Sequence, residues 1–345
     1  MLKKLSVLLL CLTVVLLSGC KSKKKIQAES KPEPVSSESE APSCINPLTG
    51  LPMDESKENI RPVAVMINNV NFSQPVQTAV NKADILYETE VEGGISRLMA
   101  VYKDIASVGQ IGSVRSARYV YVDLALAHDA IYAHCGQDNT YCKPHLADID
   151  DVSVETGGVY GGTRIKNGLN WEHTLYTYGD KLFDSVKKNK VRSTVSDSTP
   201  WQDFSKSDED ITLSGGSCKK IEIPFSSSYH TVFKYDEAKK EYTRYFFDEL
   251  RKDYVNGEIT NIKNIFVLST DISDYPDKYR RKVDLTGGTG YYLVNGTYMK
   301  IKWSKGDAKA PFKFTDESGN PIKVNAGKSY VGIAGKAFAP VLSDK

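Results

Sequence analysis

Residues 291–301 read YYLVNGTYMKI, two runs of strand-forming residues joined by Asn295-Gly296. An Asn-Gly pair is the preferred two-residue turn of a tight β-hairpin, because both of its positions need a positive φ. Upstream of this hairpin, further short runs rich in β-branched and aromatic residues occur at 221–223, 231–235, 242–246 and 265–268. The pattern predicts a mostly antiparallel sheet in the C-terminal part of the chain.

The first half of the chain mixes strand and helix patterns. Short apolar runs typical of buried strands occur at 62–67, 84–88, 97–102 and 130–134. A helix capped by Ser116 and reaching about Ala127 is predicted, and a second from about Gly179 to Lys188. The fold class is therefore α+β, and we expect a layered sandwich of sheets and helices.

The N-terminus has the pattern of a lipoprotein signal. Lys3 and Lys4 precede an apolar run from Leu5 to Leu17, and Leu17-Ser18-Gly19-Cys20 matches a lipoprotein processing site. The apolar run is shorter than the roughly 20 residues needed for a permanent transmembrane helix. We predict that residues 1–19 are removed and that Cys20 carries fatty acyl chains such as palmitate. Two or three such chains hold a protein stably at the outer face of the membrane.

The rest of the chain divides into a tether and a folded part. Residues 20–44 comprise the lipidated cysteine and a stretch rich in Ser, Glu, Pro and Lys, with little apolar surface to bury. As a coil, this tether spans about 25–30 Å on average. We expect an N-terminal α+β domain at 45–200 and a mainly antiparallel β domain at 201–345, packed on the first.

The charge balance excludes a general nucleic-acid-binding function. Residues 1–44 hold seven of the 45 basic and four of the 43 acidic residues, so the remainder has a net charge of −1. A folded part with this balance lacks the excess of positive charge that attracts a phosphate backbone. An anion site in it would have to come from a local cluster of arginines.

Secretion permits disulfides among Cys44, Cys135, Cys142 and Cys218. Cys135 and Cys142 are the nearest in sequence and form the preferred pair, which leaves Cys44 with Cys218. Free buried cysteines are the alternative. The spacing of the neighbouring histidines and cysteines is not a standard zinc pattern, so neither a metal nor another cofactor is predicted.

Several motifs occur in a recognisable order. They are EGGISR at 92–97, IGSVRSAR at 111–118, His134 after a strand, EHT at 172–174, and a C-terminal stretch from Gly288 to Gly327. This set resembles the YerB-like lipoproteins of low-GC Gram-positive bacteria, over about residues 45–340. The resemblance implies an α+β fold and a surface lipoprotein, in a family without a settled activity. Ser96 departs from the threonine more usual there, and Cys135 from a small residue.

The second motif suggests an anion site. Arg115 and Arg118 are three residues apart, so a helix starting there would place both guanidinium groups on one face near its positive end. The Ser116 hydroxyl and Arg97 would complete a site for carboxylate or phosphate. The alternative is that these arginines pair with internal acids such as Glu92, which would make them structural.

Two functional hypotheses follow. The favoured one is a surface protein that binds an anionic cell-envelope polymer or a partner protein through the arginine region. The alternative is a cell-wall hydrolase or lyase that cleaves glycan or peptide links, with Glu92 or Asp123 and His134 or His173 as its acid and base. It requires these side chains to converge in a cleft, since a strand histidine is more often a structural donor.

Overall fold

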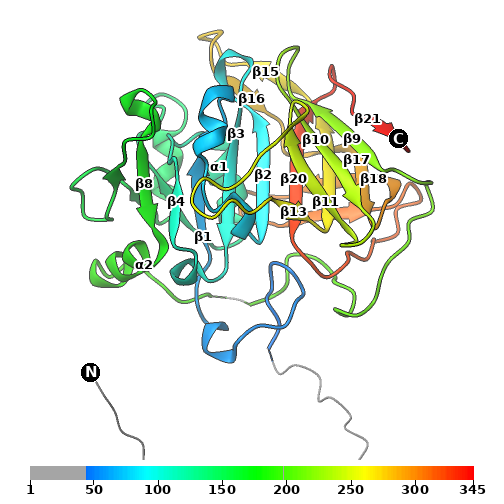
Figure 1. Ribbon diagram of the computed structural model, residues 1–345, viewed down its shortest axis with the longest axis horizontal. Helices are drawn as coiled ribbons and strands as arrows, with labels where there is room; N and C mark the ends of the chain where they lie inside the picture. Colours follow the sequence, from blue (N-terminus) through cyan, green and yellow to red (C-terminus); the bar gives the residue numbers. More distant parts are fainter. Residues whose placement is uncertain (1–43, 197) are drawn as a thin grey trace, which may run out of the picture. The chain divides into compact units, whose positions relative to one another are not determined.

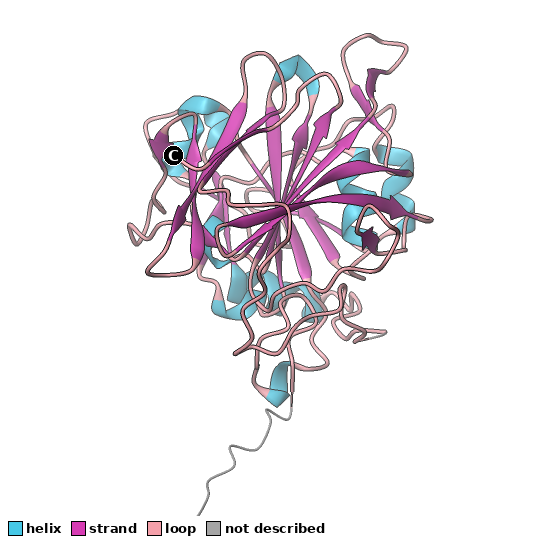
Figure 2. Cartoon of the chain, turned by 90° about the vertical axis from the view of Figure 1, so that its right-hand side faces the viewer, coloured by secondary structure: helices cyan, strands magenta, loops and turns pink. Residues whose placement is uncertain are grey.

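A strongly twisted ten-stranded sheet runs through the protein (Figures 1 and 2). The computed structural model describes residues 44–196 and 198–345. The predicted signal peptide, Cys20 and all of the tether except Cys44 lie outside the described residues. Within the described part, no helix is long and apolar enough to cross a membrane.

The ten strands come from both halves of the chain. In spatial order they are β19 (Phe312–Thr315), β18 (Thr297–Lys305), β17 (Gly287–Val294), β14 (Asn264–Thr270), β20 (Ser329–Gly335), β2 (Ile85–Glu90), β3 (Ser96–Tyr102), β1 (Val63–Ile67), β5 (Ile131–His134) and β6 (Asp151–Ser153).

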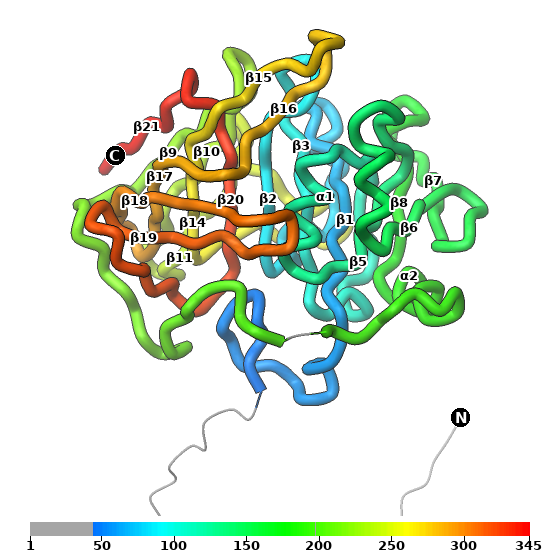
Figure 3. Tube along the Cα trace, turned by 180° about the vertical axis from the view of Figure 1, so that it is seen from behind, coloured from blue at the N-terminus to red at the C-terminus, as the bar shows by residue number. Residues whose placement is uncertain are grey.

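Strand β20 joins the two predicted domains. It is parallel to β2 on one side and to β14 on the other, so Ser329 is in register with both Ile85 and Asn264 (Figure 3). The sheet therefore continues across the expected boundary at residue 200, and the described residues belong to one compact unit. Parallel pairs also occur at β1–β5 and β5–β6.

Smaller sheets and two α-helices complete the fold. A six-stranded antiparallel sheet contains β12 (Glu249–Leu250), β11 (Glu241–Phe246), β10 (His230–Asp236), β9 (Lys220–Pro224), β21 (Val341–Ser343) and β13 (Asn261–Ile262). A three-stranded sheet contains β4 (Gln110–Gly112), β8 (Leu175–Tyr178) and β7 (Thr163–Arg164), and a hairpin contains β15 (Ile272–Asp274) and β16 (Arg281–Val283). The helices are α1 (Tyr119–Leu126) and α2 (Gly179–Lys188).

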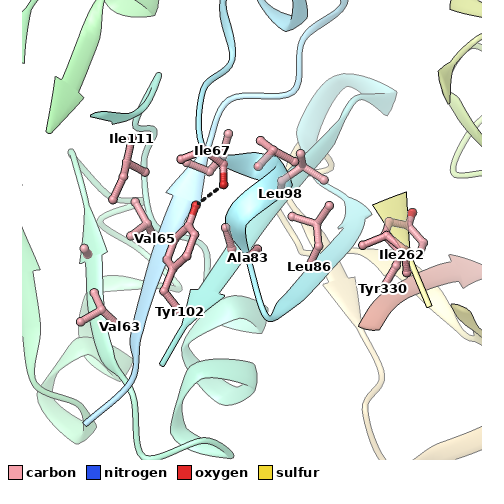
Figure 4. Packing of buried hydrophobic residues seen from close by; sticks show 14 of the residues in the cluster. Val63, Val65, Ile67, Ala83, Leu86, Leu98, Tyr102, Ile111, Ile262 and Tyr330 are labelled. Atoms are coloured by element: carbon pink, nitrogen blue, oxygen red, sulfur yellow. Dashed lines mark hydrogen bonds between the residues drawn. The ribbon is translucent and has the colours of Figure 1, made fainter. Parts of the chain in front are cut away.

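The large sheet is buried on both faces. Alternate residues of β1 belong to different cores, because successive side chains of a strand point to opposite faces. Val63, Val65 and Ile67 belong to the first core, which also contains residues of β9, β10, β8 and α2 (Figure 4). Ala64 and Met66 belong to the second core, together with the apolar face of α1. This double burial explains the continuous apolar runs in the sequence.

The fold is thus mostly β, with several sheets and an antiparallel C-terminal part. The hairpin at Asn295-Gly296 is confirmed, with φ values of 50° and 71° and Val294 paired with Thr297. The expected layering of helices on the sheets stays a prediction: residues of β9–β11 and of α2 contribute to the first core, and residues of α1 to the second. Beyond α1 and α2, the helices among the described residues are short 3₁₀ turns.

Candidate functional site

Several of the predicted site residues lie at one edge of the large sheet. Strands β1, β2 and β5 run in the same direction, so their carboxyl ends share this edge, and β3 starts there because it is antiparallel. Glu92 follows β2, Arg97 lies at the start of β3, and His134 ends β5. Ligands of open α/β sheets bind at such an edge.

Residues 113–118 are extended, which corrects the helix predicted to start at Ser116. The amide of Arg115 donates to Met66 O at 3.0 Å, and the amide of Ala117 to Gly136 O at 2.9 Å. These hydrogen bonds to segments far away in the sequence keep the backbone extended, whereas capping by Ser116 would have favoured a helix. The helix starts only at Tyr119, and no side chain caps it.

The extended backbone separates the two arginines of the motif. Residues three apart in an extended chain point to opposite sides. The Arg115 guanidinium accordingly lies against Glu172, whereas that of Arg118 lies against Glu92. The predicted site with both guanidinium groups on one helical face is therefore not formed.

Glu92 occupies the position between Arg97 and Arg118. Its Oε2 accepts a hydrogen bond from Arg118 Nε at 2.7 Å, and its Oε1 accepts further bonds from Arg118 Nη2 and from Arg97 Nη2, the latter at 3.5 Å. Arg97 also donates to Ser116 O at 2.8 Å. The Arg97 side chain is only 4% exposed. These contacts agree with the alternative prediction, in which Arg97 and Arg118 pair with an internal acid and are structural.

Electrostatics in this cluster favour a charged carboxylate. Burial alone favours the neutral form of Glu92, but the hydrogen bonds from Arg118 and the charges of Arg97 and Arg118 outweigh it and lower its pKa to about 2. Burial and the neighbouring Arg118 lower the pKa of Arg97. A free anion would have to displace Glu92 in order to bind here.

His173 lies in a second cluster, together with Arg115. Arg115 Nη1 donates to the Glu172 carbonyl at 2.9 Å and is 3.4 Å from the Glu172 carboxylate. The other oxygen of that carboxylate is 3.2 Å from Nε2 of His173, whose Nδ1 is 2.8 Å from the Asn68 amide. Burial of His173 and the charge of Arg115 lower the pKa of this histidine.

The catalytic candidates do not converge. His134 is 1% exposed, and its two ring nitrogens contact Gly136 O at 2.9 Å and Asp151 at 3.1 Å. Asp123 lies on α1, where burial raises its pKa and Lys305 opposes the rise. Neither of these residues contacts Glu92 or His173 within the described structure. Glu92, His134 and His173 instead each have hydrogen-bonding partners of their own.

Three functional candidates were missed in the sequence. Arg164 covers one face of Trp171, its guanidinium carbon lying 3.2 Å from the ring centroid. Trp171 is 71% exposed, and Phe72, which meets His173 edge to face, is 57% exposed. The available signals were an arginine two residues after the glycine-rich stretch GGVYGG at 157–162 and a tryptophan beside the EHT motif.

Arg164 and Arg115 form a pair of cations with little compensation. Burial lowers the pKa of Arg164, and the charge of Arg115 lowers it further. Burial raises the pKa of Cys135, and the charges of both arginines oppose that rise. The Nε atoms of both arginines are buried without a hydrogen-bond partner. Arg164 takes part in no ion pair among the described residues, and the acid beside Arg115 is the exposed Glu172. This surface, defined by Arg115, Arg164, Trp171 and Phe72, is called the arginine-tryptophan surface below.

All four cysteines of the described part are free, so neither predicted disulfide is formed. Cys135 packs against the first core and Cys142 lies in the second, on the opposite face of the large sheet. Cys218 belongs to the first core, whereas Cys44 lies near Lys103. No group of three or more His, Cys, Asp or Glu side chains in the described ranges could hold a metal ion.

Comparisons with known proteins identify the class. The N-terminal domain of a protein of unknown function, DUF3048, matches residues 48–192, and the C-terminal domain of the same family matches residues 221–331. The chain belongs to this family, for which no function is known.

A curated relative is "Putative lipoprotein YerB" of Bacillus subtilis (strain 168). It is 25% identical over 358 residues, which cover 99% of this chain and 96% of the relative. The crystal structure of YerB from Bacillus subtilis has a TM-score of 0.75 and 23% identity, and the match covers 87% of this chain and 99% of that chain. The resemblance seen in the motifs is confirmed.

Proposed function

We propose that the protein is a lipoprotein, anchored at the outer face of the cell membrane, that binds an anionic cell-envelope polymer through the arginine-tryptophan surface. The observation that carries the proposal is the charge of Arg164, which no ion pair among the described residues offsets, together with Arg115, whose acidic partner Glu172 is exposed. Arginine is suited to this role because its planar guanidinium group forms paired hydrogen bonds with carboxylate and phosphate.

The exposed rings favour a polymer with sugar or similar ring units. Trp171 keeps one face of its indole free, since Arg164 covers the other. An aromatic ring with an exposed face gives a large apolar contact at low entropic cost. An open surface with two cations and two rings suits an extended anionic chain better than a small enclosed ligand.

A binding role accounts for the site better than the hydrolase or lyase. That alternative requires an acid and a base that reach a substrate together, whereas Glu92, His134 and His173 are bound to separate partners and Asp123 lies apart from them on α1. An envelope protein with an acidic surface could use the same cations, and the experiment below separates it from a polymer.

Replacing both Arg115 and Arg164 with alanine should weaken binding of the full chain to purified wall polymer at least about tenfold, since two charge-assisted contacts are lost. Pull-down of the detergent-solubilised chain with wall and membrane fractions measures this. Protease treatment of the fractions would abolish binding only if the partner were a protein.

The matched control is Lys187→Ala with Lys188→Ala, which removes two positive charges from the end of α2. This control should retain at least half of the binding. Equal binding by the arginine variant and the parent would contradict the proposal. An equal loss of binding in both variants would contradict it as well, because it would show that the polymer is attracted by positive charge in general and not by this surface.

Replacing Cys20 with alanine should abolish metabolic labelling with radioactive palmitate, because the processing site then offers no thiol for the lipid. The parent chain should be labelled and should fractionate with membranes. Replacing Cys44, the next cysteine along the chain, should leave labelling unchanged. A parent chain that stays unlabelled and fractionates with the cytosol would contradict the predicted anchor.

A further inference from the structure

A cavity of about 380 Å³ lies over strands β18, β17, β14 and β20 on one face of the large sheet, remote in the fold from the arginine-tryptophan surface. Its floor consists of two rows of cross-strand neighbours, which the strand register defines. The first row contains Ala334, Ser269, Thr289 and Lys302, and the second contains Val267, Tyr291 and Lys300.

The size of the side chains explains the hollow. The first row has small side chains on its three inner strands, next to the large ring of Tyr291 in the second row. Phe338 also lines the cavity, and its amide donates to Gly335 O at 2.8 Å, which fixes it just after β20. Small side chains between larger ones leave a trough, because directly opposite residues of neighbouring strands are only about 5 Å apart.

Positive charge dominates the lining. It includes Lys300, Lys302 and Lys336, against the single acid Glu317. Lys302 Nζ donates to the backbone carbonyl of Glu317 at 2.8 Å, so its charge is not neutralised there. Lys336 forms an exposed ion pair with Asp271 at 2.6 Å, and Lys300 has no hydrogen bond or ion pair within the described residues.

We propose that this cavity binds a small anion carried on a ring-shaped body. Lys300 and Lys302 would hold the carboxylate, phosphate or sulfonate group, and the ring would lie against Tyr291. The hydroxyl groups of Ser269 and Thr289 make no side-chain hydrogen bond in the described structure and are available to the ligand. The volume is near the lower end of the roughly 300–1,000 Å³ typical of small-molecule sites, which fits one or two rings.

The test uses 8-anilino-1-naphthalenesulfonate, a fluorescent sulfonate with aromatic rings, and the full chain in detergent. Lys300→Glu with Lys302→Glu should weaken its binding at least about tenfold, because two attractive charges become repulsive. Both lysines are exposed on β18, so the variant should fold. Ser269→Phe, which fills the floor of the cavity, should also abolish binding at this site.

The matched control is Lys282→Glu with Lys313→Glu, the same charge change at exposed lysines outside the lining. It should change the affinity less than about threefold. Inorganic phosphate, an anion without a ring, should compete only weakly. The proposal is overturned if dye binding survives in the lysine variant, if the control weakens it equally, or if phosphate competes as well as a ring-bearing phosphate such as phenyl phosphate.

Discussion

Replacing Arg244 with methionine should lower the free energy of unfolding by about 3–5 kcal/mol, the usual cost of leaving one buried charge of a pair without its partner. The Arg244 side chain is 1% exposed and that of Glu88 is 0% exposed, with 3.6 Å between Nη2 and Oε2. Methionine fills much of the same volume but supplies no positive charge. Urea unfolding at pH 7 measures the loss.

The position of this pair explains the size of the effect. Glu88 lies on β2 of the large sheet and Arg244 on β11 of the six-stranded sheet, so the pair holds the two sheets together. The Glu88 carboxylate also accepts hydrogen bonds from Ser96 at 2.6 Å, Tyr330 at 2.8 Å and Thr231 at 2.9 Å. These donors are arranged for a charged acceptor and remain when the guanidinium is removed.

A second substitution separates the charge effect from lost packing. Glu88→Gln combined with Arg244→Met removes both charges, and we expect it to recover part of the stability lost in the single variant. Lys239→Met, which breaks the exposed pair with Asp236, is the control and should leave the urea unfolding midpoint nearly unchanged. A loss below about 1 kcal/mol for Arg244→Met would show that the buried pair contributes little.

Replacing Glu92 with glutamine should destabilise the protein by about 3 kcal/mol at pH 7, and the difference from the parent should vanish at low pH. The folded-state pKa of Glu92 is about 2, against an ordinary value of 4.5. Each unit of pKa difference corresponds to about 1.4 kcal/mol. Because the pKa is lowered on folding, the charged carboxylate stabilises the folded state fully above about pH 4.5.

Unfolding curves between pH 7 and pH 2 test this directly. As the pH falls from about 4.5 to about 2, the parent should lose this contribution, whereas the glutamine variant has none to lose. Glu172→Gln is the control, since its carboxylate is 58% exposed beside Arg115. It should cost less than about 1 kcal/mol. A constant difference between parent and Glu92→Gln across this range would contradict the assignment.

Some of the motif residues are buried and hold the fold together, whereas others are exposed to solvent. Arg97 and Arg118, which the motif suggested as anion ligands, share the single carboxylate of Glu92 and lie at the junction of β2, β3 and the start of α1. Ser96 donates to Glu88. A threonine at this position would carry the same hydroxyl. Arg115 is the one predicted binding arginine that faces an exposed acid.

Features that depend only on residues close together in the sequence could be predicted from the sequence alone. The Asn295-Gly296 turn was predictable because only a few residue types accept a positive φ at both turn positions. Strands β1, β2, β3 and β5 were predictable from apolar runs, since burial on both faces leaves no polar alternation. The predicted lipoprotein signal is likewise a contiguous pattern that requires no knowledge of the fold, and it stays a prediction because residues 1–43 lie outside those described.

The strand order and the side-chain pairs of the site could not be predicted from the sequence. They are stabilised by contacts between segments that lie far apart in the chain. β20 lies between β2 and β14 only once the whole sheet is assembled. The amides of residues 115 and 117 bond to Met66 and Gly136, which overrides the local preference for a helix at Ser116. The pairing of Glu88 with Arg244, and the contact of Arg164 with Trp171 beside the Arg115–Glu172 pair, likewise depend on tertiary packing that no local pattern encodes.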